Sequence, residues 1–278
     1  MSASPFTEEI RRILVAVDAS PHSLAALEAA AEMAARLQAE LLGLFVEDVN
    51  LLRSADLPIT REVCSLSATT LPMDSRHVER ELRAQAEQAR RALASVASRR
   101  RVRWSFRVTR GSVTEELLRA ASEADLVTVG KSGWTPTWPR GLGGTARAVL
   151  HRGTTPLLIA GRGAEPRPPI YVVYDGSDAS RRALRIAFRL ARGQEKELRI
   201  LAIAREEADA RALQTDLSDL AGQASVETIS GGEVGLVNAV AHAVRDGMLV
   251  LPVDGRALTG EAVISLLTAL NRPALLVR

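Results

Sequence analysis

A glycine-rich stretch near the middle of this sequence has the spacing of a phosphate-binding loop. Gly130 and Gly133 follow the apolar run at 125–129. A second group of small residues, 143–145, precedes a helix-like segment at 146–150. Glycines at the end of a strand let the backbone approach a ligand closely. Glycines at a helix start leave N–H groups exposed at the positive end of the helix dipole, so the two together predict a site for phosphate.

Asp18 is the second residue that points to a ligand. It directly follows the apolar run 13–17, at the strand end where ligands bind in open α/β sheets. Its carboxylate could accept a hydrogen bond from an adenine amino group or a ribose hydroxyl. Backbone groups around Val17 and Val129 could contact the edge of the adenine ring. These residues together predict a nucleotide, with its adenosine near Asp18 and its phosphates near the glycines.

Other active-site patterns are missing or misplaced. The sequence has no G-x-x-x-x-G-K-[ST] phosphate loop. Residues 141–146 satisfy the dinucleotide fingerprint by letter, but the preceding strand ends about a dozen residues too early for that motif. The four histidines have no metal-ligand spacing, and Cys64 has no base placed beside it by the sequence. We therefore predict no catalytic residue and no metal site.

The chain contains an internal repeat. A shift of 157 positions places Asp18 on Asp175 and Ser20 on Ser177 without a gap, and a shift of 117 places 156–159 on the last apolar run. Each half alternates short apolar runs with helical patterns, which is typical of βα units and a parallel sheet. The Gly/Pro-rich segment 161–169 separates the halves.

The glycine spacing resembles the ATP-binding pattern of the universal stress protein family: Gly, two residues, Gly, nine residues, Gly, then Ser or Thr. Other marks of that family are Asp18-Ala-Ser-Pro, Gly111, the run at 124–127 and Thr155-Pro156. The resemblance covers essentially the whole chain as two tandem copies. It implies an α/β fold with two tandem doubly wound, five-stranded parallel sheets of the adenine nucleotide alpha hydrolase-like class. Each sheet would have strand order 3-2-1-4-5 and lie in an α/β/α sandwich.

The resemblance also sets expected domain limits. Residues 1–163 would form the nucleotide-binding domain, with a long insert at about 47–97 that contains a charged helix. Residues 168–278 would form a degenerate copy. Family members commonly dimerise through their last strands, so 157–159 and 274–277 could pair within one chain as a pseudo-dimer. Association of whole chains into a homodimer stays open.

The ligand implied for the first half is ATP or another adenine nucleotide, with or without Mg²⁺. The candidate binding residues are Ala16, Val17, Asp18, Val46, Val129, Gly130, Ser132, Gly133, Gly143, Gly144 and Thr145. Two features depart from the family pattern. Gly144 stands where a hydroxyl residue is expected, with Thr145 one place later. Trp134 and Trp138, together with two prolines, make the loop stiffer and more apolar than a phosphate loop needs to be.

The second half keeps Asp175 but has lost the glycines. Its corresponding strand, 249–251, runs directly into Pro252. The 117 shift places Gly260 on Gly143 and Glu261 on Gly144, and a carboxylate at that position would repel phosphate. We predict that the second half does not bind a nucleotide triphosphate.

The composition of the chain argues against nucleic-acid binding and against membrane insertion. The net charge of +3 and the 3% aromatic content do not favour a nucleic-acid surface. A solvated helix end explains the basic run 99–101 better than a nucleic-acid patch. A single cysteine, no secretory signal and no long apolar run favour a cytoplasmic protein without membrane insertion.

Three functions remain compatible with these observations. The first is a stress-response protein that binds ATP in a regulatory manner, with slow hydrolysis at most. The second is a non-nucleotide ligand-binding or adaptor module that uses the inserted segment as a partner surface. The third, and weakest, is an enzyme that consumes ATP.

Overall fold

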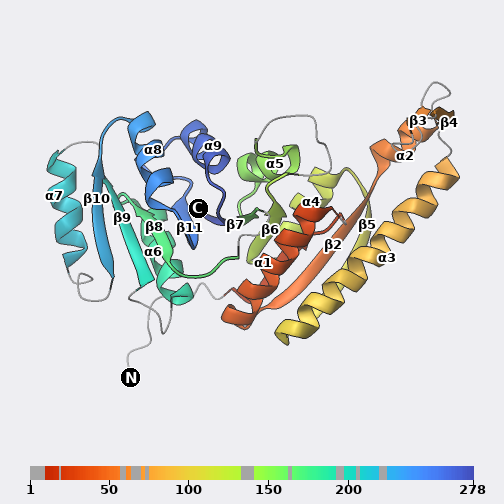
Figure 1. Ribbon diagram of the computed structural model, residues 1–278, viewed down its shortest axis with the longest axis horizontal. Helices are drawn as coiled ribbons and strands as arrows, with labels where there is room; N and C mark the ends of the chain where they lie inside the picture. The colour runs from red at the N-terminus through yellow and green to blue at the C-terminus, as the bar shows by residue number, and fades with distance from the viewer. Residues whose placement is uncertain are drawn as a thin grey trace.

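A single ten-stranded sheet runs through the molecule. The computed structural model describes residues 10–18, 20–56, 61–63, 70–72, 75–132, 141–161, 165–191, 197–204, 207–218 and 224–278. The strand order is β10-β9-β8-β11-β12-β7-β6-β1-β2-β5. Every neighbouring pair is parallel except β12 and β7 at the centre (Figure 1). The two predicted five-stranded sheets are therefore present and are joined edge to edge.

The N-terminal half supplies five of these strands, in the spatial order β5-β2-β1-β6-β7. Counted along the chain, this is the predicted order 3-2-1-4-5. Its elements are β1 (Arg12–Ala16), α1 (Pro21–Leu37), β2 (Glu40–Asp48), α2 (Val49–Ala55), β3 (Arg61–Val63), β4 (Thr70–Pro72), α3 (Ser75–Arg100), β5 (Trp104–Gly111), α4 (Val113–Ala121), β6 (Leu126–Gly130), α5 (Gly144–Arg152) and β7 (Leu157–Ala160).

The C-terminal half repeats the same order as β10-β9-β8-β11-β12. Its elements are β8 (Ile170–Tyr174), α6 (Asp178–Leu190), β9 (Leu198–Ala204), α7 (Glu207–Asp216), β10 (Ser225–Ser230), α8 (Glu233–Ala243), β11 (Met248–Pro252), α9 (Gly260–Ala269) and β12 (Ala274–Val277). The internal repeat read from the sequence is thus a repeat of the fold.

The last strands of the two halves form the seam between them. Leu158 of β7 lies opposite Leu275 of β12, and Leu157 lies opposite Leu276, in an antiparallel register. Leu158 and Leu275 are both fully buried. The pairing hides two apolar sheet edges that would otherwise invite association with other chains. The predicted intrachain pairing of 157–159 with 274–277 is confirmed.

Helices cover both faces of the sheet, which makes each half an α/β/α sandwich (Figure 1). Alternate residues of each buried strand point to opposite faces. One core cluster packs residues such as Val15 and Val172 beneath α1, α3, α6 and α7. The other packs residues such as Leu14 and Val173 beneath α4, α5, α8 and α9. Both clusters continue across the seam.

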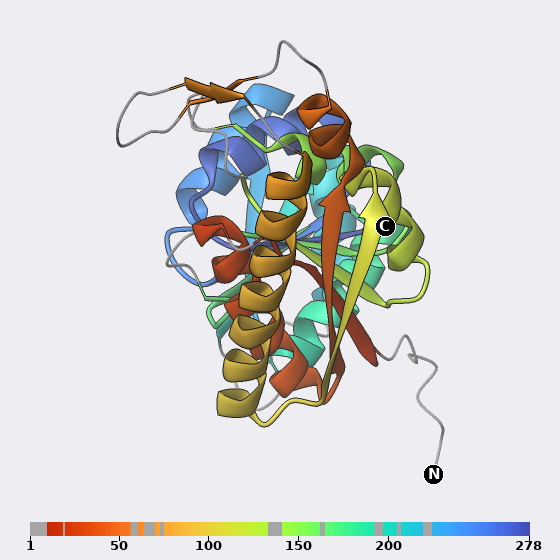
Figure 2. The same cartoon turned by 90° about the vertical axis from the view of Figure 1, so that its right-hand side faces the viewer.

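The inserted segment of the first half ends in the long helix α3. The charged helix expected within the insert extends over Ser75–Arg100, and its inward side buries a stripe that includes Leu82, Ala86 and Leu93. Helix α3 packs on α1, β2 and β5, and Figure 2 shows it lying along this end of the sheet. It takes the crossover position that α7 takes in the second half. The extra structure is therefore α2 and the β3–β4 hairpin.

The basic end of α3 is partly neutralised by α1. Arg99 pairs with Glu28 at 2.6 Å, and Arg100 pairs with Glu32. These pairs fix the helix end and reduce the positive charge expected from the sequence. Among the described residues, no helix combines the length and apolar character needed to cross a bilayer.

Candidate functional site

The first half carries a pocket of about 590 Å³ at the carboxyl ends of β1, β2 and β6. Ten of the predicted residues line it: Ala16, Val17, Asp18, Val46, Val129, Gly130, Ser132, Gly143, Gly144 and Thr145. Gly133 lies outside the described residues, as do Cys64, Trp134 and Trp138. The fold thus brings together, in one pocket, predicted residues that are more than a hundred positions apart in the sequence.

Asp18 is held by the turn between β1 and α1. Its Oδ1 accepts a hydrogen bond from the Ser20 amide at 2.9 Å, and its own amide donates to Ser23 Oγ at 3.2 Å. Ser20 is the N-cap of α1, because its Oγ accepts from the Ser23 amide at 3.1 Å. An aspartate followed two residues later by a helix-capping serine favours this turn. The turn fixes the Asp18 carboxylate at the pocket wall.

Gly130 has a packing role as well as a place in the pocket. A Cβ atom at this position would lie 2.9 Å from the backbone oxygen of His22, at the start of α1. Real Cβ atoms do not approach a backbone oxygen so closely, so a side chain is excluded here. The His22 ring in turn meets Ser132, with Nε2 lying 3.0 Å from Oγ. The sequence interpretation gave ligand approach as the reason for Gly130, and close contact with α1 is an additional reason.

One side of the pocket is formed by the N-terminus of α5. Gly143 is its N-cap and provides no side-chain hydrogen bond. A Cβ on Gly144 would meet no atom of a described residue within 4 Å, so that among these residues open space lies in front of the first turn. The amides of a first helical turn lack partners within the helix and lie at the positive end of its dipole. This end of the pocket is suited to an anion.

Arg147 also lines the pocket, and the sequence interpretation missed it. It lies one turn into α5 and is exposed, and its side chain forms no ion pair or hydrogen bond among the described residues. Its guanidinium adds a positive charge beside the helix N-terminus. The available signal was an arginine three residues after Gly144. The pocket thus separates a carboxylate, Asp18, from a cationic end formed by α5 and Arg147.

Comparison with known protein families agrees with this geometry. The model of the universal stress protein family matches residues 9–161 and, a second time, residues 167–263. The chain belongs to the universal stress protein family. The first match spans β1 to β7, and the second spans β8 to β11 and the first residues of α9.

Solved structures with the same arrangement come from other universal stress proteins. A universal stress protein from Archaeoglobus fulgidus is 18% identical, with 95% of this chain and 97% of that chain covered and a TM-score of 0.72. A putative universal stress protein from Pseudomonas aeruginosa is 16% identical, with 96% and 92% covered and a TM-score of 0.58. At these identities the likeness shows a shared fold. No curated protein matches the sequence.

In the second universal stress protein repeat, a loop packs over the equivalent aspartate, Asp175. Asp175 Oδ2 accepts from the amides of Arg256 at 2.5 Å and Ala257 at 2.9 Å. Its Oδ1 accepts from the Ser177 amide at 3.0 Å and from Ser177 Oγ at 2.5 Å. Burial raises the pKa of the Asp175 carboxyl, but these hydrogen bonds outweigh burial and hold the pKa below its ordinary value. The carboxylate that would hold an adenosine is already used to hold a loop.

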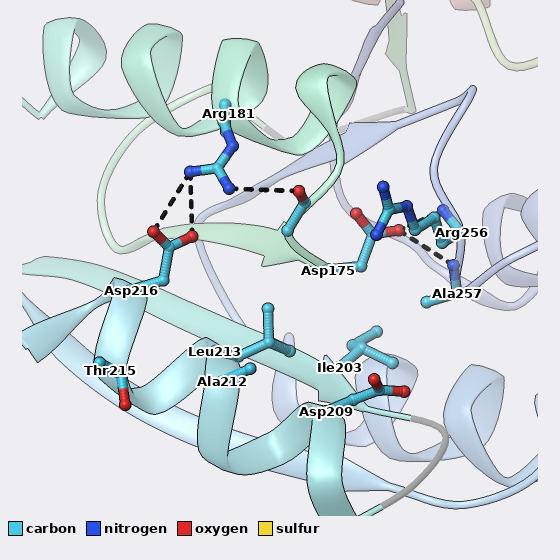
Figure 3. A pocket seen from close by; sticks show the side chains of 11 residues that line it. Asp175, Arg181, Ile203, Asp209, Ala212, Leu213, Thr215, Asp216, Arg256 and Ala257 are labelled. Atoms are coloured by element: carbon cyan, nitrogen blue, oxygen red, sulfur yellow. Dashed lines mark hydrogen bonds and ion pairs between the residues drawn. The ribbon is translucent and has the colours of Figure 1, made fainter.

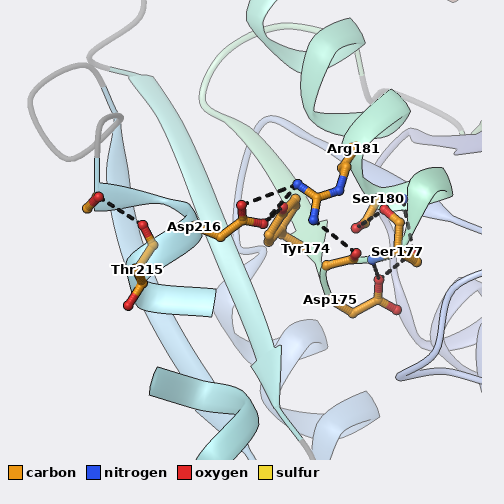
Figure 4. Close-up of polar contacts among 9 residues, drawn as sticks. Tyr174, Asp175, Ser177, Ser180, Arg181, Thr215 and Asp216 are labelled. Atoms are coloured by element: carbon orange, nitrogen blue, oxygen red, sulfur yellow. Dashed lines mark hydrogen bonds and ion pairs between the residues drawn. The ribbon is translucent and has the colours of Figure 1, made fainter. Parts of the chain in front are cut away.

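A pocket of about 750 Å³ remains beside this loop, between α6 and α7 (Figure 3). Arg181 pairs with Asp216 at 2.9 Å, and the buried Tyr174 hydroxyl donates to the same carboxylate (Figure 4). Burial raises the pKa of Tyr174, and the Asp216 carboxylate raises it further. These contacts fasten α7 to β8 and α6, so several polar groups of the pocket serve to hold its walls.

The start of α9 corrects one detail of the sequence alignment. Its N-cap is Thr259, whereas the N-cap of α5 is Gly143, so the shift at the helix start is 116 and not 117. Helix α9 has ten residues and α5 has nine, which restores the shift of 117 further on. Glu261 is therefore exposed in the first turn, one place beyond the predicted position. The carboxylate that occupies the start of α9 is Glu233, which accepts from the Thr259 amide at 2.8 Å.

Proposed function

We propose that this universal stress protein binds an adenine nucleotide, foremost ATP, in the pocket of its N-terminal half. The observation that carries the proposal is the start of α5, which has no side-chain cap and faces the same pocket as Asp18. Arg147 adds charge at the same end. An anionic group at the α5 end and a hydrogen-bond donor at the Asp18 end are what a nucleotide offers.

Each part of the pocket has a role in this proposal. Asp18 accepts a hydrogen bond from the adenine amino group or a ribose hydroxyl, and Val46 and Val129 contact the base. Gly144 and Thr145 present backbone amides to the phosphates, with Arg147 as their counter-charge. Where Mg²⁺ accompanies ATP, it neutralises part of the phosphate charge.

Binding is proposed to be regulatory. Asp18 is the one carboxylate among the described lining residues, and its Oδ1 already accepts from Ser20. It lies at the adenosine end, too far along the ligand to act as a base on a phosphate-bound water. We therefore expect slow hydrolysis at most, in a cytoplasmic stress-response protein.

The two halves are proposed to differ in role. Residues 1–163 would form the nucleotide-binding domain, and residues 168–278 would form a domain that binds no nucleotide triphosphate. The use of Asp175 by the loop at Arg256 and Ala257, and of the Thr259 amide by Glu233, supports this division.

A matched pair of substitutions tests the proposal. Gly144→Asp and Gly260→Asp each place a carboxylate at the first residue of the equivalent helix, and neither Cβ would come within 4 Å of an atom in the part of the chain that the structure describes. An acidic residue there favours the helix itself, so both variants should fold. ATP should raise the melting temperature of the wild type and of Gly260→Asp but not of Gly144→Asp. A hundredfold excess over Kd corresponds to about 2.7 kcal/mol of stabilisation.

The outcome separates the candidate functions. If wild-type protein shows no shift with millimolar ATP, ADP or AMP, nucleotide binding is wrong and the adaptor function becomes the better explanation. If Gly260→Asp loses the shift as well, the assignment to one half is wrong.

A further inference from the structure

Lys131 lies inside the candidate nucleotide loop but points away from the pocket. Its neighbours Gly130 and Ser132 line the pocket, and Lys131 does not. Its ammonium group instead crosses to the second half. Lys131 Nζ donates to the backbone oxygens of Thr268 at 3.0 Å and Leu270 at 2.5 Å.

Those two oxygens lie at the C-terminal end of α9. Thr268 lies in the last turn of α9, and Leu270 is its C-cap. Carbonyls at a helix C-terminus lack partners within the helix and carry the negative end of its dipole. Helix α9 has no basic residue in its own last turn. Burial lowers the pKa of the half-buried Lys131 ammonium. The two carbonyls accept hydrogen bonds that the ammonium would otherwise donate to water.

The backbone of the same residue holds the phosphate side of the pocket. The Lys131 oxygen accepts from the Gly143 amide at 2.8 Å, and Gly143 is the N-cap of α5. The Lys131 amide donates to the Ala160 oxygen at 2.9 Å, at the end of β7 beside the seam. One residue therefore connects the start of α5, the seam and the end of α9.

We infer that the second half positions the phosphate side of the first-half pocket, and that Lys131 is the positioning residue. The inference rests on the proposed function, because it concerns how that pocket binds phosphate. The second half fixes the Lys131 side chain, Lys131 fixes Gly143, and Gly143 begins the helix whose amides face the phosphates. A degenerate half with no nucleotide of its own thereby serves the site of its neighbour.

Thermodynamic linkage requires that nucleotide binding and the Lys131 contact with α9 affect each other equally. If the end of α9 favours the binding geometry, then a bound nucleotide must in turn stabilise the contact with α9. ATP should therefore slow hydrogen exchange of the α9 end and β12, which lie outside the pocket. Adenosine should do so much less, because its contacts lie at the Asp18 end.

A second contact joins the halves in the opposite direction, from Arg278 of the second half to α5 of the first half. The guanidinium of Arg278 donates to the backbone oxygen of Leu150 near the end of α5, and the Arg278 oxygen accepts from Arg182 Nε. Each half thus places a cation on the last helix of the other half. Of these two cations, Lys131 is the residue that is hydrogen-bonded to Gly143, the N-cap of α5.

Three variants of the full chain test the inference. Lys131→Met keeps the length of the side chain and removes its charge, and Lys131→Arg restores a cation. Leu275→Ala weakens the seam at a buried position without touching the loop. Affinities for ATP and for adenosine are measured by calorimetry, and exchange of segments 141–147 and 266–277 is followed by mass spectrometry with and without ligand.

We expect Lys131→Met to change the affinity for ATP but not the affinity for adenosine. Loss of a charge-assisted contact should weaken ATP binding by Lys131→Met about three- to tenfold and leave adenosine binding unchanged. Segment 141–147 of the ligand-free variant should exchange faster than in the wild type, and ATP should no longer protect 266–277. Lys131→Arg should recover part of both effects, and Leu275→Ala should bind the two ligands in the wild-type ratio.

Other outcomes overturn the inference. Equal losses for ATP and adenosine, or unchanged exchange at 141–147 in Lys131→Met, would reduce Lys131 to a general stabilising contact. Faster exchange at 266–277 on adding ATP would mean that Lys131 leaves α9 to bind the phosphates directly. If the wild type binds neither ligand, the proposed function is wrong, and exchange of the ligand-free proteins alone decides whether Lys131 holds the start of α5.

Discussion

Arg147 adds a side-chain charge to a site otherwise built from backbone amides. The candidate phosphate end consists of Gly143, Gly144 and Thr145, whose contribution is mainly their N–H groups. Such a site binds anions through the N–H groups and the positive dipole end of the helix, and both are screened by salt. Arg147 is exposed and without a partner in the described structure, so it can move to meet a ligand.

We predict that Arg147→Gln weakens the binding of ATP more than that of AMP and leaves the melting temperature unchanged. An exposed charge contributes about 1 kcal/mol, which is roughly a fivefold rise in the Kd for ATP. Titrations at low and high salt should show a smaller salt dependence for the variant. Arg152→Gln is the matched control, since Arg152 lies at the other end of α5 and pairs with Glu115. Equal effects of the two substitutions would contradict a specific role for Arg147.

The pocket residues could be predicted because their types are constrained by the local backbone. The end of β1 and the start of α5 need an aspartate turn and glycines, and such needs leave a visible spacing in the sequence. Arg147 carries no comparable signal, because an exposed arginine on a helix surface is ordinary. The contact of Gly130 with His22 was equally hidden, since it depends on how α1 packs against the loop.

At the scale of elements, the loop at 254–257 shows what spacing cannot predict. The sequence indicated correctly that the second half lacks the glycine loop, and it named Glu261 as the obstructing carboxylate. The structure instead uses Asp175 to hold the amides of Arg256 and Ala257, and Glu233 to hold Thr259. Backbone amides are donors in almost every residue, so their partners cannot be read from residue types.

Asp175→Asn should therefore loosen this loop and destabilise the protein. Loss of the charge from a buried carboxylate with four hydrogen bonds should cost about 1–3 kcal/mol at neutral pH. The pKa of Asp175 is lowered in the folded state, so its contribution is complete above the unfolded pKa and is lost as the pH falls through the folded pKa. Urea denaturation should show a constant difference between variant and wild type from about pH 5 to 8, narrowing below about pH 4. Asp178→Asn, at an exposed position in the first turn of α6, is the control and should show little change.

At the scale of the whole molecule, the two repeats behave as one sheet. The resemblance to the family predicted two five-stranded sheets and the pairing of their last strands, which covers two apolar edges. It could not predict that both core clusters would run unbroken across the seam, since this depends on the register of Leu158 with Leu275. Nor could it predict the cations, Lys131 and Arg278, that each half places on the other.

A continuous core implies that the two halves unfold together. We predict a single calorimetric transition for the ligand-free protein, with equal calorimetric and van't Hoff enthalpies. Leu275→Ala at the seam should cost about 2–5 kcal/mol and lower the temperature of that single transition. Leu267→Ala, at a buried position of α9, serves as a control for loss of volume within one half. If scanning calorimetry resolves two transitions and Leu275→Ala moves only one of them, the halves are independent domains in contact. In that case the coupling through Lys131 would have to act between two folding units and not within one.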